Sequence, residues 1–215
     1  MRDERGFTMI ELMISMLVSM LVLGSAASVI SAVQSTYAHQ MDDATVEQEA
    51  RFAMDWIRRT IEQAGSNPYS VSVTDCPSAG TAVQSVRMDP DGDGLPDDIR
   101  VQADAGIPDG LIVGSAGCNL SNSQANEDVT IAHNPANNTI TRFDRGTDAG
   151  PIAWTDGVFT GLEFQYLDSS MTWTAFSGAV RIVRVTITGR SRSARPGMNE
   201  GATFTLESDI RLKSQ

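Results

Sequence analysis

The sequence predicts an α+β protein, in which a long N-terminal helix with a membrane-spanning first half packs on an antiparallel β-sheet head. Three observations support this class. An apolar run extends from Phe7 to about Val33. A segment with helical periodicity follows, from Gln34 to about Gly65, and strands with two-residue alternation begin at Val129. The chain of 215 residues is therefore long enough for an anchor helix and one domain with its own core.

The apolar run carries a single formal charge, that of Glu11. At about 1.5 Å of rise per residue, the run gives a helix that can cross a hydrocarbon core of roughly 30 Å. A carboxylate in lipid costs about 2.5–3.5 kcal/mol on insertion scales, so such a charge is usually paired or functional. The alternative is an ordinary secretory signal cleaved near Ser25-Ala26-Ala27, but its apolar region would be shorter.

The start of the chain resembles the N-terminal signature of type IV prepilins and pseudopilins, in the residues Gly6-Phe7-Thr8-Met9-Ile10-Glu11-Leu12. This resemblance implies that residues 1–6 are a leader peptide. It implies that prepilin peptidase cleaves between Gly6 and Phe7 and that the new N-terminus is methylated. It also implies an assembly role for Glu11, whose carboxylate would pair with a mature N-terminal amine. One departure is that the two arginines of the leader are balanced by two acidic residues.

The helix is expected to continue beyond the membrane as an amphipathic segment over residues 34–65. Apolar residues recur there near 3.6-residue spacing, which predicts one stripe facing the head. The stripe comprises Tyr37, Met41, Ala44, Ala50, Ala53, Trp56 or Ile57, Ile61 and Ala64. Gly65 and Pro68 form a stop signal. The segment Arg51 to Gly65 resembles the corresponding region of PilW-like minor pilins and GspJ-like minor pseudopilins, as do the C-terminal strands.

Residues 66–215 are expected to form the head. Its first part, to residue 125, is rich in loop-forming residues, with short strands near Val71, Val83 to Met88 and Ile99 to Val101. The second part alternates apolar and polar residues, as half-buried strands do. Its strands are expected around Val129 and Ile131, Ile140 and Phe143, Leu162 to Tyr166, Val183 to Ile187, and Phe204 to Leu212.

An Asp-rich loop in the head matches the spacing of calcium-binding loops. Asp89, Asp91, Asp93 and Gly94 fall at positions 1, 3, 5 and 6, and carboxylates at such positions supply the oxygen ligands of Ca²⁺. Position 12, normally an acid, is Arg100, so Asp98 or Asp104 would have to substitute. The pattern predicts a Ca²⁺ site with metal ligands drawn from Asp89, Asp91, Asp93, Asp97 and Asp98. The alternative is an acidic turn that holds no ion.

The two cysteines, Cys76 and Cys118, lie in no CxxC or Cys/His setting, which argues against a redox or zinc role. Assembly on the outer side of the inner membrane would expose them to oxidising conditions, where a disulfide is expected. Two free buried thiols are the alternative.

Charge and motif content argue against nucleic-acid binding and catalysis. The net charge of −11 makes the chain a poor non-specific binder of nucleic acid. His39 and His133 have no metal-ligand spacing, and there is no GxSxG elbow or phosphate-binding loop. We expect most of the acidic residues to form a solvated surface. The sequence thus predicts a structural subunit rather than an enzyme.

The resemblance implies a minor pilin of a type IV pilus, similar to PilW, that takes part in filament assembly initiation or tip function. Its partners would be other pilin or pseudopilin subunits and prepilin peptidase. Residues 7–33 would span the inner membrane once, with the head in the periplasm, and later form filament core at the cell surface. One alternative is a minor pseudopilin of a type II secretion system. A calcium-dependent adhesin-type pilus subunit, or a DNA-uptake subunit, is another.

Overall fold

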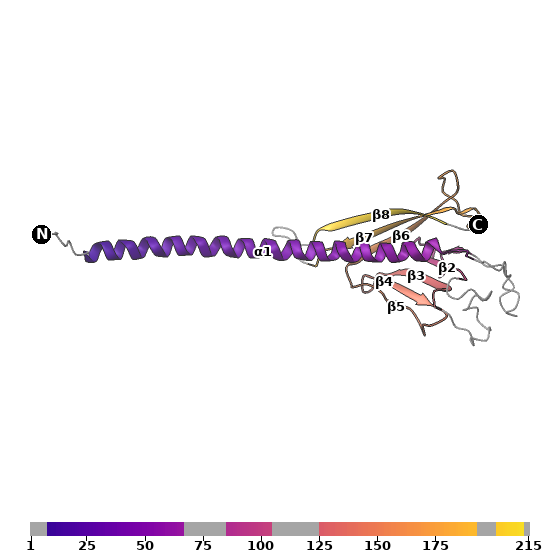
Figure 1. Cartoon of the computed structure of the whole chain (residues 1–215), viewed down its shortest axis with the longest axis horizontal. Helices are drawn as coiled ribbons and strands as arrows, with labels where there is room; N and C mark the ends of the chain where they lie inside the picture. The colour runs from indigo at the N-terminus through magenta and orange to yellow at the C-terminus, as the bar shows by residue number, and fades with distance from the viewer. Residues whose placement is uncertain (1–7, 67–84, 105–124, 193–200, 213–215) are drawn as a thin grey trace. The chain divides into compact units, whose positions relative to one another are not determined.

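The structure is a computed structural model, and it describes residues 8–66, 85–104, 125–192 and 201–212 (Figure 1). It confirms the α+β class, because a long N-terminal helix, α1, is followed by strands that pair antiparallel in two sheets. The chain divides into two compact units, Met1–Asp43 and Ala44–Gln215, and each is described by itself.

The first unit contains the apolar part of α1, which extends as a whole over Met9–Glu62. Every residue from Met9 to Val33 is exposed. This stretch is long and apolar enough to cross a membrane, by length and composition. Three of its serine hydroxyls bond within the helix: Ser15 and Ser19 each donate to the carbonyl oxygen four residues earlier, at 2.7 Å. Ser25 donates likewise to the Val22 carbonyl.

In the second unit, one stripe of α1 is buried against the head. Its buried residues are Val46, Ala50, Ala53, Met54, Ile57, Thr60 and Ile61. The predicted stripe was therefore right from Ala50 onward and wrong before it, since Tyr37 and Met41 are 67% and 75% exposed and Ala44 is exposed as well. The first buried residue of this stripe is Val46. The periodic apolar residues of the sequence therefore begin at Tyr37, earlier than the buried stripe, which begins at Val46.

The C-terminal end of α1 is fixed by a glycine. Gly65 has φ 74°, a left-handed conformation that glycine adopts without a Cβ penalty. Its N–H donates to the carbonyl oxygen of Gln102 at 2.9 Å, which ties the end of the helix to a strand of the head. The predicted stop at Gly65 is confirmed, although regular helix ends at Glu62. Pro68 lies outside the described residues.

The first sheet has five strands, and each pairs with the next in the chain. The strands are β1 (Val86–Met88), β2 (Asp98–Gln102), β3 (Asp128–Asn134), β4 (Thr139–Asp144) and β5 (Ile152–Ala153). The predicted hairpin between β3 and β4 is present, and Asn138 takes a positive φ of 55° in its turn. β5 was not predicted, because a strand of two exposed residues has no measurable alternation.

The second sheet has three strands: β6 (Phe159–Leu167), β7 (Ile182–Arg190) and β8 (Thr203–Arg211). β7 is central and pairs with both neighbours. Gly189 of β7 lies opposite Phe204 of β8, and a Cβ at Gly189 would come within 2.3 Å of the Phe204 ring. The aromatic ring therefore occupies the space that any other side chain at position 189 would need. A short 3₁₀ helix, η3 (Ser177–Ala179), precedes β7.

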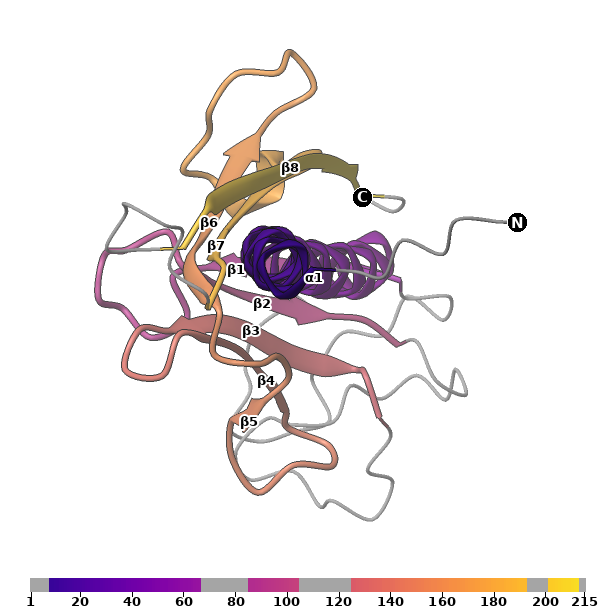
Figure 2. The same cartoon turned by 90° about the vertical axis from the view of Figure 1, so that its left-hand side faces the viewer.

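The core of the second unit lies between α1 and both sheets, and in Figure 2 the three-stranded sheet and strands β2–β5 lie on different sides of the helix. The helix contributes Ile57 and Ile61. The sheets contribute Ile99, Ile131, Ile140, Phe159, Phe164, Ile187 and Ile210. At the edge of this core Trp56 of α1 stacks on Trp154, with ring centroids 5.1 Å apart.

Several acidic residues of the head are buried and are exceptions to the expected solvated acidic surface. They are Asp98, Asp104, Glu127, Asp128 and Asp144. Asp128 is fully buried and accepts two hydrogen bonds from the Arg100 guanidinium, and Asp144 is paired with Arg142. A buried charge needs such a partner to offset the loss of hydration.

Candidate functional site

Glu11 lies in the first turn of α1 and bonds to the residue that precedes the helix. Its Oε2 accepts hydrogen bonds from the backbone N–H of Thr8 at 2.9 Å and from the Thr8 hydroxyl at 2.7 Å. In return the Thr8 hydroxyl oxygen accepts the backbone N–H of Glu11 at 3.3 Å. This reciprocal pattern is a capping box, with Thr8 at N-cap and Glu11 at the third helical position.

The capping box gives Glu11 a local reason to be charged. The first N–H groups of a helix have no intrahelical partner, and the helix dipole places partial positive charge there. A carboxylate at that point satisfies one donor and opposes that partial charge. The sequence analysis missed Thr8, although the Thr-x-x-Glu spacing before an apolar run is the signal for this motif.

The predicted processing site and cysteines lie outside the described residues. Gly6 and Phe7 precede the first described residue, Thr8. Cys76 and Cys118 fall in the two gaps of the head, 67–84 and 105–124. The cleavage, the pairing of Glu11 with the amine of Phe7 and the disulfide therefore stay predictions.

In the Asp-rich loop, which joins β1 to β2, the structure brings three of the five predicted ligands together. Carboxylate oxygens of Asp89, Asp91 and Asp98 lie within 4.8 Å of one another. Asp93 and Asp97 are not members of this group among the described residues. Of the two acids considered as substitutes at position 12, it is Asp98, the first residue of β2, that joins the group.

The loop backbone is held by the same carboxylates. The two oxygens of Asp89 accept the N–H groups of Gly92 at 2.8 Å and Gly94 at 3.1 Å. Both glycines have positive φ, 80° and 82°, and a Cβ at either would meet strain in that conformation. Asp91 Oδ1 accepts the N–H of Asp93 at 3.1 Å. The carboxylates of Asp89 and Asp91 therefore point toward the backbone of their own loop.

Asp98 differs from the other two acids because it is buried. Only 2% of its surface is exposed. Its Oδ2 accepts the N–H of Asp91 at 3.3 Å, whereas its buried Oδ1 has no hydrogen-bond partner among the described residues. Burial raises the pKa of Asp98 to about 7, and the negative charge of Asp91 adds to this effect. Burial also raises the pKa of the adjacent Asp97, which Asp93 increases further.

The end of the Asp-rich loop is bonded to both sheets. The Pro96 carbonyl accepts the N–H of Phe164 in β6 at 2.7 Å. The Asp97 carbonyl accepts the N–H of His133 in β3 at 3.1 Å. The Tyr166 hydroxyl, also from β6, donates to the carbonyl of Asp98 at 3.3 Å. The loop therefore connects the five-stranded and three-stranded sheets.

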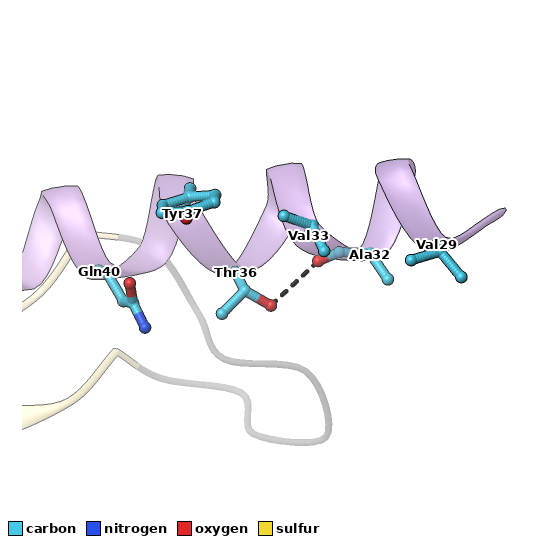
Figure 3. A pocket seen from close by; sticks show the side chains of 6 residues that line it. All are labelled: Val29, Ala32, Val33, Thr36, Tyr37 and Gln40. Carbon is cyan, nitrogen blue, oxygen red and sulfur yellow. Dashed lines mark hydrogen bonds between the residues drawn. The ribbon is translucent and has the colours of Figure 1, made fainter. Parts of the chain in front are cut away.

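A hollow on α1 offers no comparable chemistry (Figure 3). It is lined along one face of the helix by Val29, Ala32, Val33, Thr36, Tyr37 and Gln40. The Thr36 hydroxyl donates to the carbonyl of Ala32 at 3.0 Å, as Figure 3 shows, so it is already satisfied. A mostly apolar face on a single helix has the character of a packing surface.

Comparison with known proteins gave one family match. Residues 1–27 match the prokaryotic N-terminal methylation motif. No curated protein and no solved structure matched the chain.

The motif and the α+β layout fit a membrane-anchored structural subunit that carries a prokaryotic N-terminal methylation motif. Within that class the motif supports a type IV pilin-like protein, as pilins and pseudopilins are. The motif implies processing by prepilin peptidase and contact with other pilin subunits, and it indicates a structural role rather than catalysis.

Proposed function

We propose that the protein is a minor pilin of a type IV pilus, which is cleaved after Gly6, methylated at Phe7 and used in filament assembly initiation or tip function. The protein first crosses the inner membrane once, with its head in the periplasm. It then enters the filament, where the apolar half of α1 packs among the corresponding helices of other subunits.

The observation that carries this proposal is the complete exposure of the apolar residues Met9 to Val33. Exposed apolar surface of this extent is unfavourable in water, at about 25 cal/mol for each Å². Lipid covers it before assembly, and neighbouring helices cover it afterwards. The hydroxyls of Ser15 and Ser19 support both states, since they are bonded inside the helix and need no water.

A minor rather than major role is supported by resemblance. The end of α1 carries Arg51, Arg58 and Arg59 and closes at Ala64-Gly65, as in the PilW-like and GspJ-like proteins. In the structure these arginines lie within 4 Å of carboxylates on the same helix, for example Arg51 with Glu47 at 2.6 Å. They therefore form an exposed, charged face that leaves the opposite stripe to the core. A minor pseudopilin of a secretion system would use the same parts.

Processing is tested by intact-mass spectrometry of the protein extracted from membranes. We expect a mature chain that begins at Phe7 and carries one methyl group. Gly6→Ala should slow cleavage and Gly6→Val should block it, because the peptidase site adjoins the membrane and accepts no side chain there. A mature terminus near Ser28, unaffected by Gly6→Val, would instead identify an ordinary signal peptide.

Filament incorporation is tested by shearing surface filaments and quantifying the protein against the major subunit. A minor pilin is expected in the sheared fraction at a small fraction of the major subunit, together with reduced piliation when its gene is deleted. Loss of protein secretion with normal piliation would assign the subunit to a secretion pseudopilus.

A further inference from the structure

We propose that the Asp-rich loop binds one Ca²⁺ through the carboxylates of Asp89, Asp91 and Asp98, and that the bound ion fixes the junction between the two sheets. This site is additional to the role of α1 in assembly, and it does not depend on that role.

The clustering of the three carboxylates is the first observation, and the state of Asp98 is an independent second one. Exposed acidic residues often cluster without an ion, but Asp98 is buried, with only 2% of its surface exposed. One of its oxygens has no partner among the described residues. A buried carboxylate oxygen without a donor is destabilising by about 1–3 kcal/mol or more. The same carboxylate faces the loop, where it accepts the N–H of Asp91, so a cation held there would satisfy it.

The donor set selects a hard divalent cation. All three groups are carboxylates, and oxygen ligands suit Ca²⁺ or Mg²⁺ rather than zinc or copper. Ca²⁺ accepts six to eight oxygens in flexible geometry, whereas Mg²⁺ requires a near-ideal octahedron and keeps most of its waters. Three carboxylates from a loop and a strand, each of which also accepts a backbone N–H, match the flexible requirement better.

Hydrogen bonds within the loop hold its conformation without an ion. Asp89 bonds to Gly92 and Gly94, and Asp91 bonds to Asp93, so the turn is closed by backbone donors. Pro90 and Pro96 restrict the unfolded chain, which reduces the entropy lost on ordering. What opposes the structure is repulsion among the three carboxylates, and one Ca²⁺ removes most of it.

The ion would act on more than the loop. Pro96, Asp97 and Asp98 offer backbone carbonyls to both sheets through Phe164, His133 and Tyr166. A cation that holds Asp98 to Asp89 and Asp91 therefore holds β2 and its contacts with β6 in place. Thermal unfolding of the whole head, and not only loop mobility, should respond to Ca²⁺.

The affinity should be modest. Position 12 of the loop is Arg100, which bonds to Asp128 and cannot be a ligand. Without that bidentate acid we expect a dissociation constant of about 10⁻⁴–10⁻³ M, typical of extracellular calcium modules.

The test is a thermal melt of the full-length protein in detergent micelles, with EDTA, with Ca²⁺ at tenfold excess over Kd, and with equal Mg²⁺. Ca²⁺ should raise Tm by roughly 3–5 °C, since binding only to the folded state stabilises it. Mg²⁺ should give less than half of that rise. Identical Tm values in EDTA and Ca²⁺ would overturn the proposal.

Variants separate this site from a general charge effect. Asp91→Asn and Asp98→Asn should abolish the Ca²⁺ rise. Asp168→Asn is the matched control, because Asp168 also caps a turn through the N–H groups of Ser170 and Thr172 but lies outside the cluster. It should keep the full rise. A rise that survives Asp98→Asn, or that disappears equally in Asp168→Asn, would overturn the assignment.

A direct measurement on the parent protein does not depend on the Asp91 and Asp98 variants folding. Tb³⁺ replaces Ca²⁺ in oxygen sites and luminesces when a nearby aromatic ring is excited. Tyr166 donates to the Asp98 carbonyl and is placed to sensitise it. We expect a saturable signal with one ion per chain, displaced by Ca²⁺ and reduced in Tyr166→Phe. A signal without saturation would indicate only surface binding and would contradict the site.

Discussion

Two carboxylates stand out in this chain, one at the start of α1 and one at the start of β2, and their surroundings are opposite. Glu11 is exposed, and its carboxylate is satisfied by the Thr8 N–H and hydroxyl. Asp98 is buried, and one of its oxygens has no partner among the described residues. From the sequence, Glu11 was expected to be costly in lipid unless paired, and the Asp-rich loop was expected to be a Ca²⁺ site or an acidic turn without an ion.

The difference shows that the environment of a charge depends on where its donors lie. The donors of Glu11 are three residues away, at a helix end that has free N–H groups. Asp98 is the first residue of β2, its carbonyl accepts the Tyr166 hydroxyl, and its side chain is buried. A third carboxylate, that of Asp128, is also buried but has Arg100. Asp128 is therefore the paired counterpart of Asp98, which has an oxygen without a partner among the described residues.

The largest loss of stability is expected when Asp128 loses its arginine partner and so becomes an unpaired buried carboxylate like Asp98. Arg100→Ala removes the guanidinium that donates to both Asp128 oxygens, and of the described side chains Gln102 and the more distant Arg145 remain as partners. Breaking a buried pair in this way typically costs 3–5 kcal/mol, and we expect about 3 kcal/mol because these partners remain. Chemical denaturation of the full chain in detergent measures this loss.

The control is Arg184→Ala. Arg184 bonds to Asp209 through the same two-nitrogen geometry, at 2.7 and 2.9 Å, but on an exposed face. Exposed pairs contribute about 0–1 kcal/mol. Equal losses in the two variants would mean that burial does not set the cost of an unpaired carboxylate here, and the contrast with Asp98 would lose its basis.

A smaller effect of opposite sign is expected for Asp98→Asn in EDTA. The substitution removes a buried charge but keeps an oxygen that can accept the N–H of Asp91. Because an unsatisfied buried group costs about 1–3 kcal/mol, the variant should be about 1 kcal/mol more stable than the parent protein without calcium. Asp93→Asn, at an exposed position in the same loop, should be neutral. A loss of stability in Asp98→Asn would argue that its carboxylate is already satisfied.

The smallest effect on stability concerns the helix start, and it separates capping from pairing with the amine. Thr8→Val removes the cap, which should weaken the first turn by about 1 kcal/mol and raise hydrogen exchange of its amides about fivefold. Glu11→Gln keeps an acceptor for the Thr8 N–H but has no charge for the mature N-terminal amine. We expect Glu11→Gln and Glu11→Ala to impair filament incorporation and Thr8→Val to leave it near normal. If Glu11→Gln is incorporated normally and Thr8→Val is not, then Glu11 acts in assembly through helix capping and not through pairing with the amine.

Much of the fold could be predicted because its signals are local. The apolar run, the Gly65 stop and the alternation in β3, β4, β6, β7 and β8 each depend on neighbouring residues. The division into two sheets could not be predicted, because alternation shows that a strand has a buried face but not which strand it pairs with. β6 follows β5 in the chain and pairs with β7. The exposure of Tyr37 and Met41 was missed for the same reason, since periodicity does not reveal where the covering surface begins.

The candidate sites show the same limit. Spacing identified the Asp-rich loop, and Asp89 and Asp91 do lie together. It could not choose between Asp97, Asp98 and Asp104, because that choice depends on which way the first residue of β2 points. At the helix start the local signal was sufficient, but Thr8 was interpreted only as part of the family signature. Its role as the N-cap residue follows from spacing alone.

The contact between Gly189 and Phe204 has a consequence for how this sequence can change in evolution. The two positions face each other across β7 and β8, and the ring fills the space above the glycine. Either change alone is unfavourable: a side chain at 189 collides with the ring, and a small residue at 204 uncovers a glycine that weakens its strand. Substitutions should therefore arrive as pairs, and in an alignment of related heads these two columns should covary more strongly than Thr188 with Thr205, the next pair along the ladder.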